Sequence, residues 1–176
     1  MNKRFLYFGF IGISIIVIAF LTWVMFLAPA PSGGDRGTAA NQEQVAIPES
    51  LGGAPRTQLV TGPEAIQQIS GMHGTEIVIR EGFIAMYEGA GKSLTLWVSV
   101  SPSTELANDL YQKMDNKMPV SKVFTNRQEI TVQGQKVIKV LGMGQEHYYW
   151  LDGDKNYWVA VGGTDAVPVV EEVMSK

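Results

Sequence analysis

The sequence predicts an α+β protein, in which an N-terminal transmembrane helix is followed by a single antiparallel-sheet domain with about three packed helices. Three observations lead to this class. Residues 5–27 form one long apolar run without a charge. Later segments with strand-like alternation are joined by short turns, which makes neighbouring strands antiparallel. Segments with apolar residues at helical spacing stand before, between and after these strands, so helices should pack on the sheet.

The run 5–27 predicts a signal-anchor helix that crosses a bilayer once. A hydrocarbon core about 30 Å thick takes about 20 helical residues. A cleaved signal peptide is the alternative, because Ala28-Pro29-Ala30 resembles a cleavage site, but its apolar region would be only about 7–15 residues long. Lys3 and Arg4 precede the run, so residues 1–4 should be a short cytoplasmic tail. We therefore expect a single-pass protein of the cell membrane with its C-terminal domain outside the cytoplasm.

Composition divides the remaining chain into a tether, 28–56, and an extracytoplasmic domain, 57–176. The tether is rich in Ala, Pro, Gly, Ser and Gln, and it has too few large apolar residues to offset chain entropy. The roughly 120 residues that follow are enough for one domain with its own core. There is no cysteine, which excludes disulfides and thiolate metal sites. The net charge of −3 argues against a nucleic-acid partner, which usually requires a basic face.

The first half of the domain predicts one helix and three strands. Thr61-Gly62-Pro63-Glu64 has the spacing of a capping box and starts a helix that ends at Gly71 or Gly74. Two strands are expected next, 76–80 and 83–88, joined at Glu81-Gly82. A glycine-rich turn then leads into 94–100, where apolar and polar residues alternate with the period of a strand.

The second half predicts a helix, four strands and a final helix. The first helix starts at Ser101–Thr104 and reaches about Met118, and a short apolar run follows at 123–124. Two hairpins are expected after it, 129–132 with 136–141 and 146–151 with 155–161. Asp152-Gly153-Asp154 in the second hairpin is the strongest turn signal in the chain. The last helix covers 164–174.

This order of elements, with its aromatic C-terminal hairpin, resembles the Mog1/PsbP-like α/β/α sandwiches. The resemblance implies an arrangement of layers and no activity, because that fold class carries unrelated functions.

Two loops imitate ligand-binding motifs without completing them. Gly89-Ala90-Gly91-Lys92-Ser93 resembles the end of a phosphate-binding loop, but Met86 stands where the motif needs glycine and a strand follows instead of a helix. Asp152 to Asn156 imitates the start of an EF-hand loop, but the twelfth position is Gly163 instead of glutamate. Both loops are therefore expected to be hairpin turns.

The two histidines, His73 and His147, are candidate site residues, since each lies near a methionine and a glutamate. Imidazoles with a carboxylate suit zinc and imidazoles with thioethers suit copper, so a metal site of His73, His147 and Glu146 is one alternative. Structural histidines that hydrogen-bond at the sheet, or catalytic ones, are the others. No catalytic motif accompanies them.

Tyr149 and Trp158 are the other candidate binding residues, because aromatic side chains crowd the last hairpin. Its register should place Tyr148 and Trp150 on one face and His147, Tyr149 and Leu151 on the other. One face must cover the core. The other either lies under a helix or offers Tyr and Trp side chains to a partner.

We therefore expect a non-enzymatic binding or accessory domain that needs no cofactor. Its partners are the lipid bilayer, through residues 5–27, and a protein or small molecule at the outer domain. A small extracytoplasmic metal-binding protein or enzyme that uses His73 and His147 is the second hypothesis. The position of the two histidines relative to each other distinguishes the hypotheses.

Overall fold

The computed structural model describes residues 45–73 and 77–176. The predicted tail 1–4, transmembrane helix 5–27 and tether residues 28–44 lie outside this part of the chain. Within the described ranges, no helix combines the length and the apolar character that crossing a bilayer requires.

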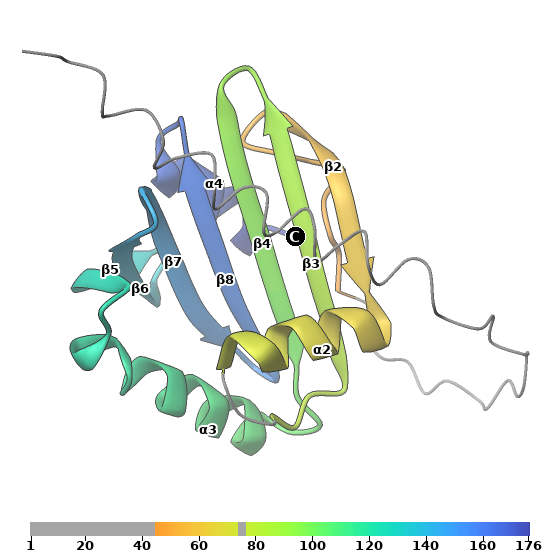
Figure 1. Ribbon diagram of the computed structural model, residues 1–176, viewed down its shortest axis with the longest axis vertical. Coiled ribbons are helices and arrows are strands. Elements are labelled where there is room, and N and C mark those ends of the chain that lie inside the picture. The colour runs from red at the N-terminus through yellow and green to blue at the C-terminus, as the bar shows by residue number, and fades with distance from the viewer. Residues whose placement is uncertain (1–44, 74–76) are drawn as a thin grey trace, which may run out of the picture. The chain divides into compact units, whose positions relative to one another are not determined.

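The described residues form a three-layer arrangement, in which an antiparallel eight-stranded sheet carries helices on both faces (Figure 1). The sheet order is β1-β2-β3-β4-β8-β7-β6-β5. In chain order the elements are β1 (Ser50–Leu51), β2 (Ala54–Thr61), α2 (Gly62–His73), β3 (Glu81–Gly89), β4 (Lys92–Val100), α3 (Thr104–Asp115), the 3-10 helix η1 (Met118–Val120), β5 (Phe124–Val132), β6 (Gln135–Gly142), β7 (Gln145–Asp152), β8 (Lys155–Gly162) and α4 (Ala166–Met174). The predicted α+β class, antiparallel sheet and three helices of the domain are confirmed.

The sheet consists of two meanders that meet at β4 and β8. These strands pair antiparallel from Ser93 opposite Gly162 to Val100 opposite Lys155. Two-residue turns link most neighbouring strands, and Ala90 and Gly91 have φ of 50° and 76°, as a type I′ hairpin requires. Both loops that imitate ligand-binding motifs are thus hairpin turns, as predicted.

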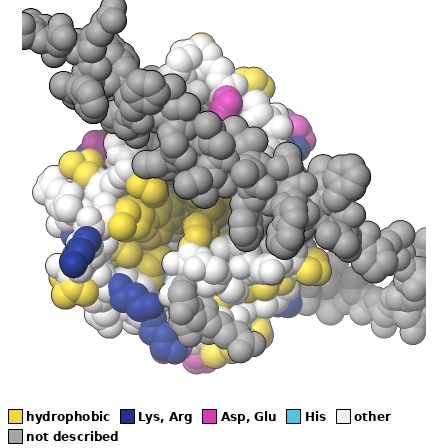
Figure 2. Space-filling view, viewed as in Figure 1, with side chains coloured by type: hydrophobic (Ala, Val, Ile, Leu, Met, Phe, Trp, Pro, Cys, Tyr) yellow, Lys and Arg dark blue, Asp and Glu magenta, His cyan; other side chains and the backbone are white. Residues whose placement is uncertain are grey.

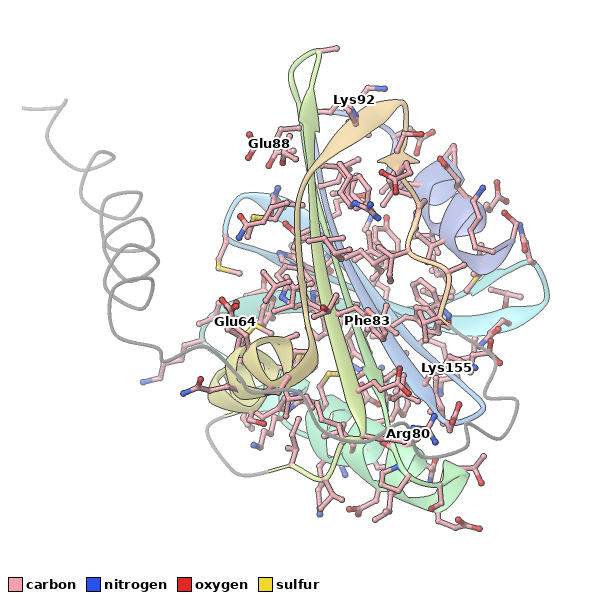
Figure 3. All side chains as sticks on the ribbon, turned by 90° about the vertical axis from the view of Figure 1, so that its right-hand side faces the viewer. Glu64, Arg80, Phe83, Glu88, Lys92 and Lys155 are labelled. Atoms are coloured by element: carbon pink, nitrogen blue, oxygen red, sulfur yellow. The ribbon has the colours of Figure 1, made fainter. Side chains whose placement is uncertain are left out.

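Alternation along the strands divides the core between the two faces (Figure 3). Leu94 and Leu96 of β4 face α4, while Trp97 faces the other side. On the α4 face, Tyr148 and Trp150 pack with Val169 and Val170.

The opposite face carries two separate clusters, one under each helix. Ala65 and Ile69 of α2 pack on Ile84, and Tyr111 of α3 packs with Ile138, Val140 and Tyr149. The predicted division of the last hairpin into two faces is confirmed.

Helices α3 and α4 each begin directly after a residue whose side chain caps the first turn. The Ser103 hydroxyl accepts a hydrogen bond from the Leu106 amide at the start of α3, and the Asp165 carboxylate accepts one from Val167 at the start of α4. Pro168 lies in the first turn of α4, where its missing N–H is not needed.

The predicted boundary at residue 56 is wrong, because it falls inside β2. Leu51 and Ala54 are fully buried in the core, and the Arg56 guanidinium donates to the Ile47 carbonyl over 3.0 Å. Small residues, proline and glycine suggested a tether. Here they instead allow a two-residue strand and a tight turn, in which Gly52 and Gly53 have positive φ.

The predicted strand 76–80 is also absent, since residues 77–80 form no strand. Ile77 and Ile79 pack beside α2 instead, while Val78 is 62% exposed.

The two edges of the sheet differ from its interior. β1 is only two residues long. At the other edge, the register of β5 against β6 shifts between Thr125 and Gln128, and Asn126 within this bulge has a φ of 55°.

The first testable prediction concerns the start of the folded part. A chain that begins at Gln44 should be soluble and should unfold cooperatively. A chain that begins at Thr57 should lose about 3 kcal/mol or more of unfolding free energy, since it lacks Leu51, Ala54 and the first three of the 8 residues of β2. Denaturation followed by circular dichroism measures both, with Leu51→Ala in the longer chain as the matched control. Equal stability of the two chains would contradict this boundary.

Candidate functional site

A cavity of about 190 Å³ lies between the sheet and the C-terminal parts of α2 and α3. Figure 2 views this face and shows hydrophobic side chains gathered in a hollow with Lys and Arg side chains near its margin. Aromatic rings, methionines and both histidines dominate the lining, which consists of Ile69, Met72, His73, Trp97, Ser99, Met114, Lys117, Met118, Phe124, Met143, His147, Asn156, Tyr157 and Trp158.

His147 is held in one tautomer by two hydrogen bonds. The Trp158 indole N–H can only donate, and it lies 3.0 Å from His147 Nδ1, so Nδ1 is an acceptor. Nε2 therefore carries the hydrogen and donates it to the Gly142 carbonyl at 3.0 Å. Both ring nitrogens are occupied. The burial of His147, which is 1% exposed, lowers its pKa, although the bond to Gly142 acts in the opposite direction.

Aromatic contacts fix Trp158 in the wall of the cavity. Its ring stacks on Tyr149 with a centroid distance of 4.8 Å and an interplanar angle of 7°. Phe124 meets Trp158 edge-on at 5.2 Å and His147 edge-on at 5.0 Å. These arrangements are the favourable ones for aromatic pairs, so the four rings form one rigid wall.

An ionic group braces this wall from behind. The Tyr149 hydroxyl donates to Asp115 Oδ1 at 2.6 Å, and Arg127 donates to both Asp115 oxygens at 2.7 and 2.8 Å. Burial acts to raise the pKa of Asp115, but the hydrogen bonds from Arg127 and Tyr149 outweigh it and the pKa is lowered. Burial and the bond to Asp115 raise the pKa of Tyr149. Neither group exchanges a proton near neutral pH, so the brace is structural.

Methionines supply the adaptable part of the lining. Met114 and Met118 are half-buried, whereas Met72 and Met143 at the mouth are 60% and 71% exposed. Unbranched thioether side chains adjust to ligands of different shape and make favourable contacts with aromatic rings. Met143 occupies the first position of the β6–β7 turn with a φ of 51°, a conformation that asparagine or glycine adopts more easily.

Among the described residues that line the cavity, Lys117 is the only Lys or Arg, and none is Asp or Glu. The Lys117 ammonium lies 3.3 Å from the His73 carbonyl, to which it donates. Burial lowers the pKa of His73, and the neighbouring Lys117 charge lowers it further. The cavity is therefore apolar inside and positive at its mouth.

Three of the four predicted binding residues line this cavity, namely His73, His147 and Trp158. Tyr149 does not line it, because Tyr149 is fully buried behind Trp158. Whether these residues bind a ligand stays a prediction.

Glu146, the third member of the alternative metal set, is not brought near the histidines. It bonds Lys139 and the Tyr148 hydroxyl, the latter at 2.7 Å, and Tyr148 belongs to the α4 face. No group of three His, Cys, Asp or Glu side chains in the described ranges could hold a metal ion. His147 could bind a metal only after losing one of its two hydrogen bonds.

The sequence did not indicate five further lining residues, Trp97, Met114, Lys117, Met118 and Phe124. These residues come from four separate segments, which only the sheet order brings together. The one available signal was the position of Met72 and Met143 near the two histidines.

Comparison with known proteins finds no matching family model, no similar curated protein and no similar solved structure.

The lowered pKa values of His147 and His73 predict a specific pH dependence of stability. Because the folded-state pKa of His147 and of His73 lies below the ordinary 6.5, the unfolded chain binds more protons as the pH falls below that value. The unfolding free energy should therefore decrease between pH 7 and 5, before the carboxylates titrate. Denaturant titrations at a series of pH values measure this slope. It should become shallower in His147→Gln, and an unchanged slope would contradict the described hydrogen bonding.

Proposed function

We propose that this protein is a single-pass membrane protein whose extracytoplasmic α+β domain binds an apolar ligand or partner group in the cavity, without catalysing a reaction. The observation that carries the proposal is that Trp158, His147 and His73 meet Trp97, Phe124 and four methionines around one cavity. Pockets lined mainly by apolar and aromatic groups with few polar ones are typical ligand sites. Met72 and Met143 are largely exposed, so they present an apolar surface to water at the mouth of the cavity. Exposed apolar surface of this kind is typical of binding sites.

The hydrogen bonding of the histidines favours binding over catalysis. Within the described ranges, neither histidine side chain bonds a serine hydroxyl or a carboxylate, the partners that general acid–base or nucleophilic catalysis uses. His147 would have to break its bond to Trp158 to accept a proton or a metal ion. The second hypothesis, a metal-binding protein or enzyme based on His73 and His147, therefore receives less support.

The membrane anchor is part of the proposal and rests on the apolar run 5–27 behind Lys3 and Arg4. The three layers of the domain support the likeness to Mog1/PsbP-like sandwiches, which concerns architecture alone.

Protease added to intact cells tests the predicted orientation. We expect digestion of the domain outside the cytoplasm, detected with an antibody against the C-terminal helix, while a cytoplasmic marker protein stays intact. Protection equal to that of the marker would refute the orientation.

A small probe tests the cavity itself. Indole should bind with a Kd on the order of 1 mM, since burying about 150–200 Å² of apolar surface contributes about 4–5 kcal/mol. The full chain in lipid nanodiscs, labelled with ¹³C in the methionine methyl groups, allows the contact to be located. Signals of Met114 and Met118 should shift, whereas Met174, on the opposite face in α4, should not. Equal shifts at all three methionines, or none, would contradict a ligand site in this cavity.

A pair of turn variants separates binding from stability. Met143→Asn should raise stability by a few tenths to about 1 kcal/mol, because asparagine tolerates a left-handed φ, and should weaken indole binding two- to fivefold. Ala90→Asn changes the equivalent position of the β3–β4 turn, which does not line the cavity, and should stabilise without affecting binding. Thermal melts and the same methyl titration measure both effects. An indole affinity that stays at the parent's value in both variants would show that Met143 does not contact the ligand.

A further inference from the structure

We propose that the ligand of this cavity is a small aromatic monocarboxylate, bound with its ring among Trp158, Trp97 and Phe124 and its carboxylate at Lys117. This inference rests on the proposed function and names the chemical class that the cavity takes. The size of the cavity, the shape of its aromatic wall and the charge at its mouth each restrict the class of ligand.

The size of the cavity restricts the apolar part to about one ring with a short side chain. An engineered protein cavity of about 150 Å³ accommodates benzene. The present cavity, of about 190 Å³, has room for a few more atoms. A macrocycle, a sterol or a long acyl chain would not fit unless the helices moved apart.

The fixed wall favours a flat group over a branched one. Stacking on Tyr149 and the hydrogen bond to His147 hold the plane of the Trp158 ring, and Phe124 stands against it edge-on. Trp97 is paired directly opposite Trp158 in neighbouring strands, so both indoles lie on the same face. A ring can make offset or edge contacts with these groups, while Met114 and Met118 adapt to its rim.

Charge at the mouth selects an anion. Asp109 and Asp115 are the acidic residues of α3 that are nearest to Lys117 in the sequence, and both have other partners. Asp109 pairs with Lys113 at 2.6 Å, and Asp115 pairs with Arg127. In the described ranges Lys117 contacts the His73 carbonyl and no carboxylate. An ammonium beside an apolar cavity whose described lining has no Asp or Glu attracts a carboxylate and repels an amine.

Ligands with the same ring and different charge test this inference. Phenylacetate, 2-phenylethanol and 2-phenylethylamine should be titrated into the full chain in phosphatidylcholine nanodiscs. These lipids carry no net charge, and empty nanodiscs correct for partitioning. Methionine methyl signals report binding at the cavity. We expect phenylacetate to bind about 3- to 10-fold more tightly than 2-phenylethanol, and 2-phenylethylamine to bind most weakly.

Substitutions of Lys117, which follows α3, and of Lys113, in the last turn of α3, assign the charge effect. Lys117→Gln should remove the preference for phenylacetate and leave the affinity for 2-phenylethanol unchanged. Lys113→Gln removes the same charge one turn earlier on the helix, where the side chain does not line the cavity, and should keep the preference. Raising the salt concentration should weaken phenylacetate binding only in proteins that retain Lys117.

The possible failures are distinguishable. If all three compounds shift Met114 and Met118 with equal affinity, or if Lys117→Gln keeps the preference, the carboxylate assignment is overturned and cavity binding stands. If none of the compounds shifts these signals at millimolar concentration, the proposed function fails as well.

Discussion

The antiparallel pairing of β4 with β8 is the constraint on which the rest of the structure depends. It joins the meander β1–β4 to the meander β5–β8, which have no other strand contact in the sheet order. It also sets Trp97 opposite Trp158 and Ser99 opposite Asn156, all on the lining of the cavity. A shift of one residue would turn these side chains to the α4 face. One pairing therefore determines both the continuity of the core and the composition of the cavity.

Around this pairing, the cavity combines a rigid wall with an adjustable one. Trp158 is fixed by stacking, by the bond to His147 and, through Tyr149, by the ion pair of Asp115 and Arg127. The adjustable part of the lining is its methionines, whose rotamers change at low cost. Rigid groups limit the entropy lost on binding, while adaptable groups tolerate differences between ligands. Such a division is expected for a domain that recognises one chemical class and not a single compound.

Much of the domain could be predicted from local pattern. Alternation identified β4 and the last hairpin, and start signals identified α2 and α3, because these signals depend on neighbours in the sequence. β1 and the start of β2 were missed because their composition resembles a linker, and their burial arises from long-range packing of Leu51 and Ala54. Residues 77–80 have strand-like composition, but Ile77 and Ile79 pack in the cluster beside α2 instead of in the sheet. The cavity could be predicted only in part, since its wall depends on the order of the strands.

The two edges of the sheet have a consequence for behaviour at high local concentration. A long open edge offers unpaired backbone groups to a second copy, and proteins with such edges tend to aggregate. Here one edge ends in the two-residue strand β1, and the other is distorted by the bulge at Asn126 beside the charged Arg127. For a domain held on a membrane surface, as proposed here, diffusion in two dimensions brings copies together often. Interrupted edges let such copies collide without growing into a shared sheet.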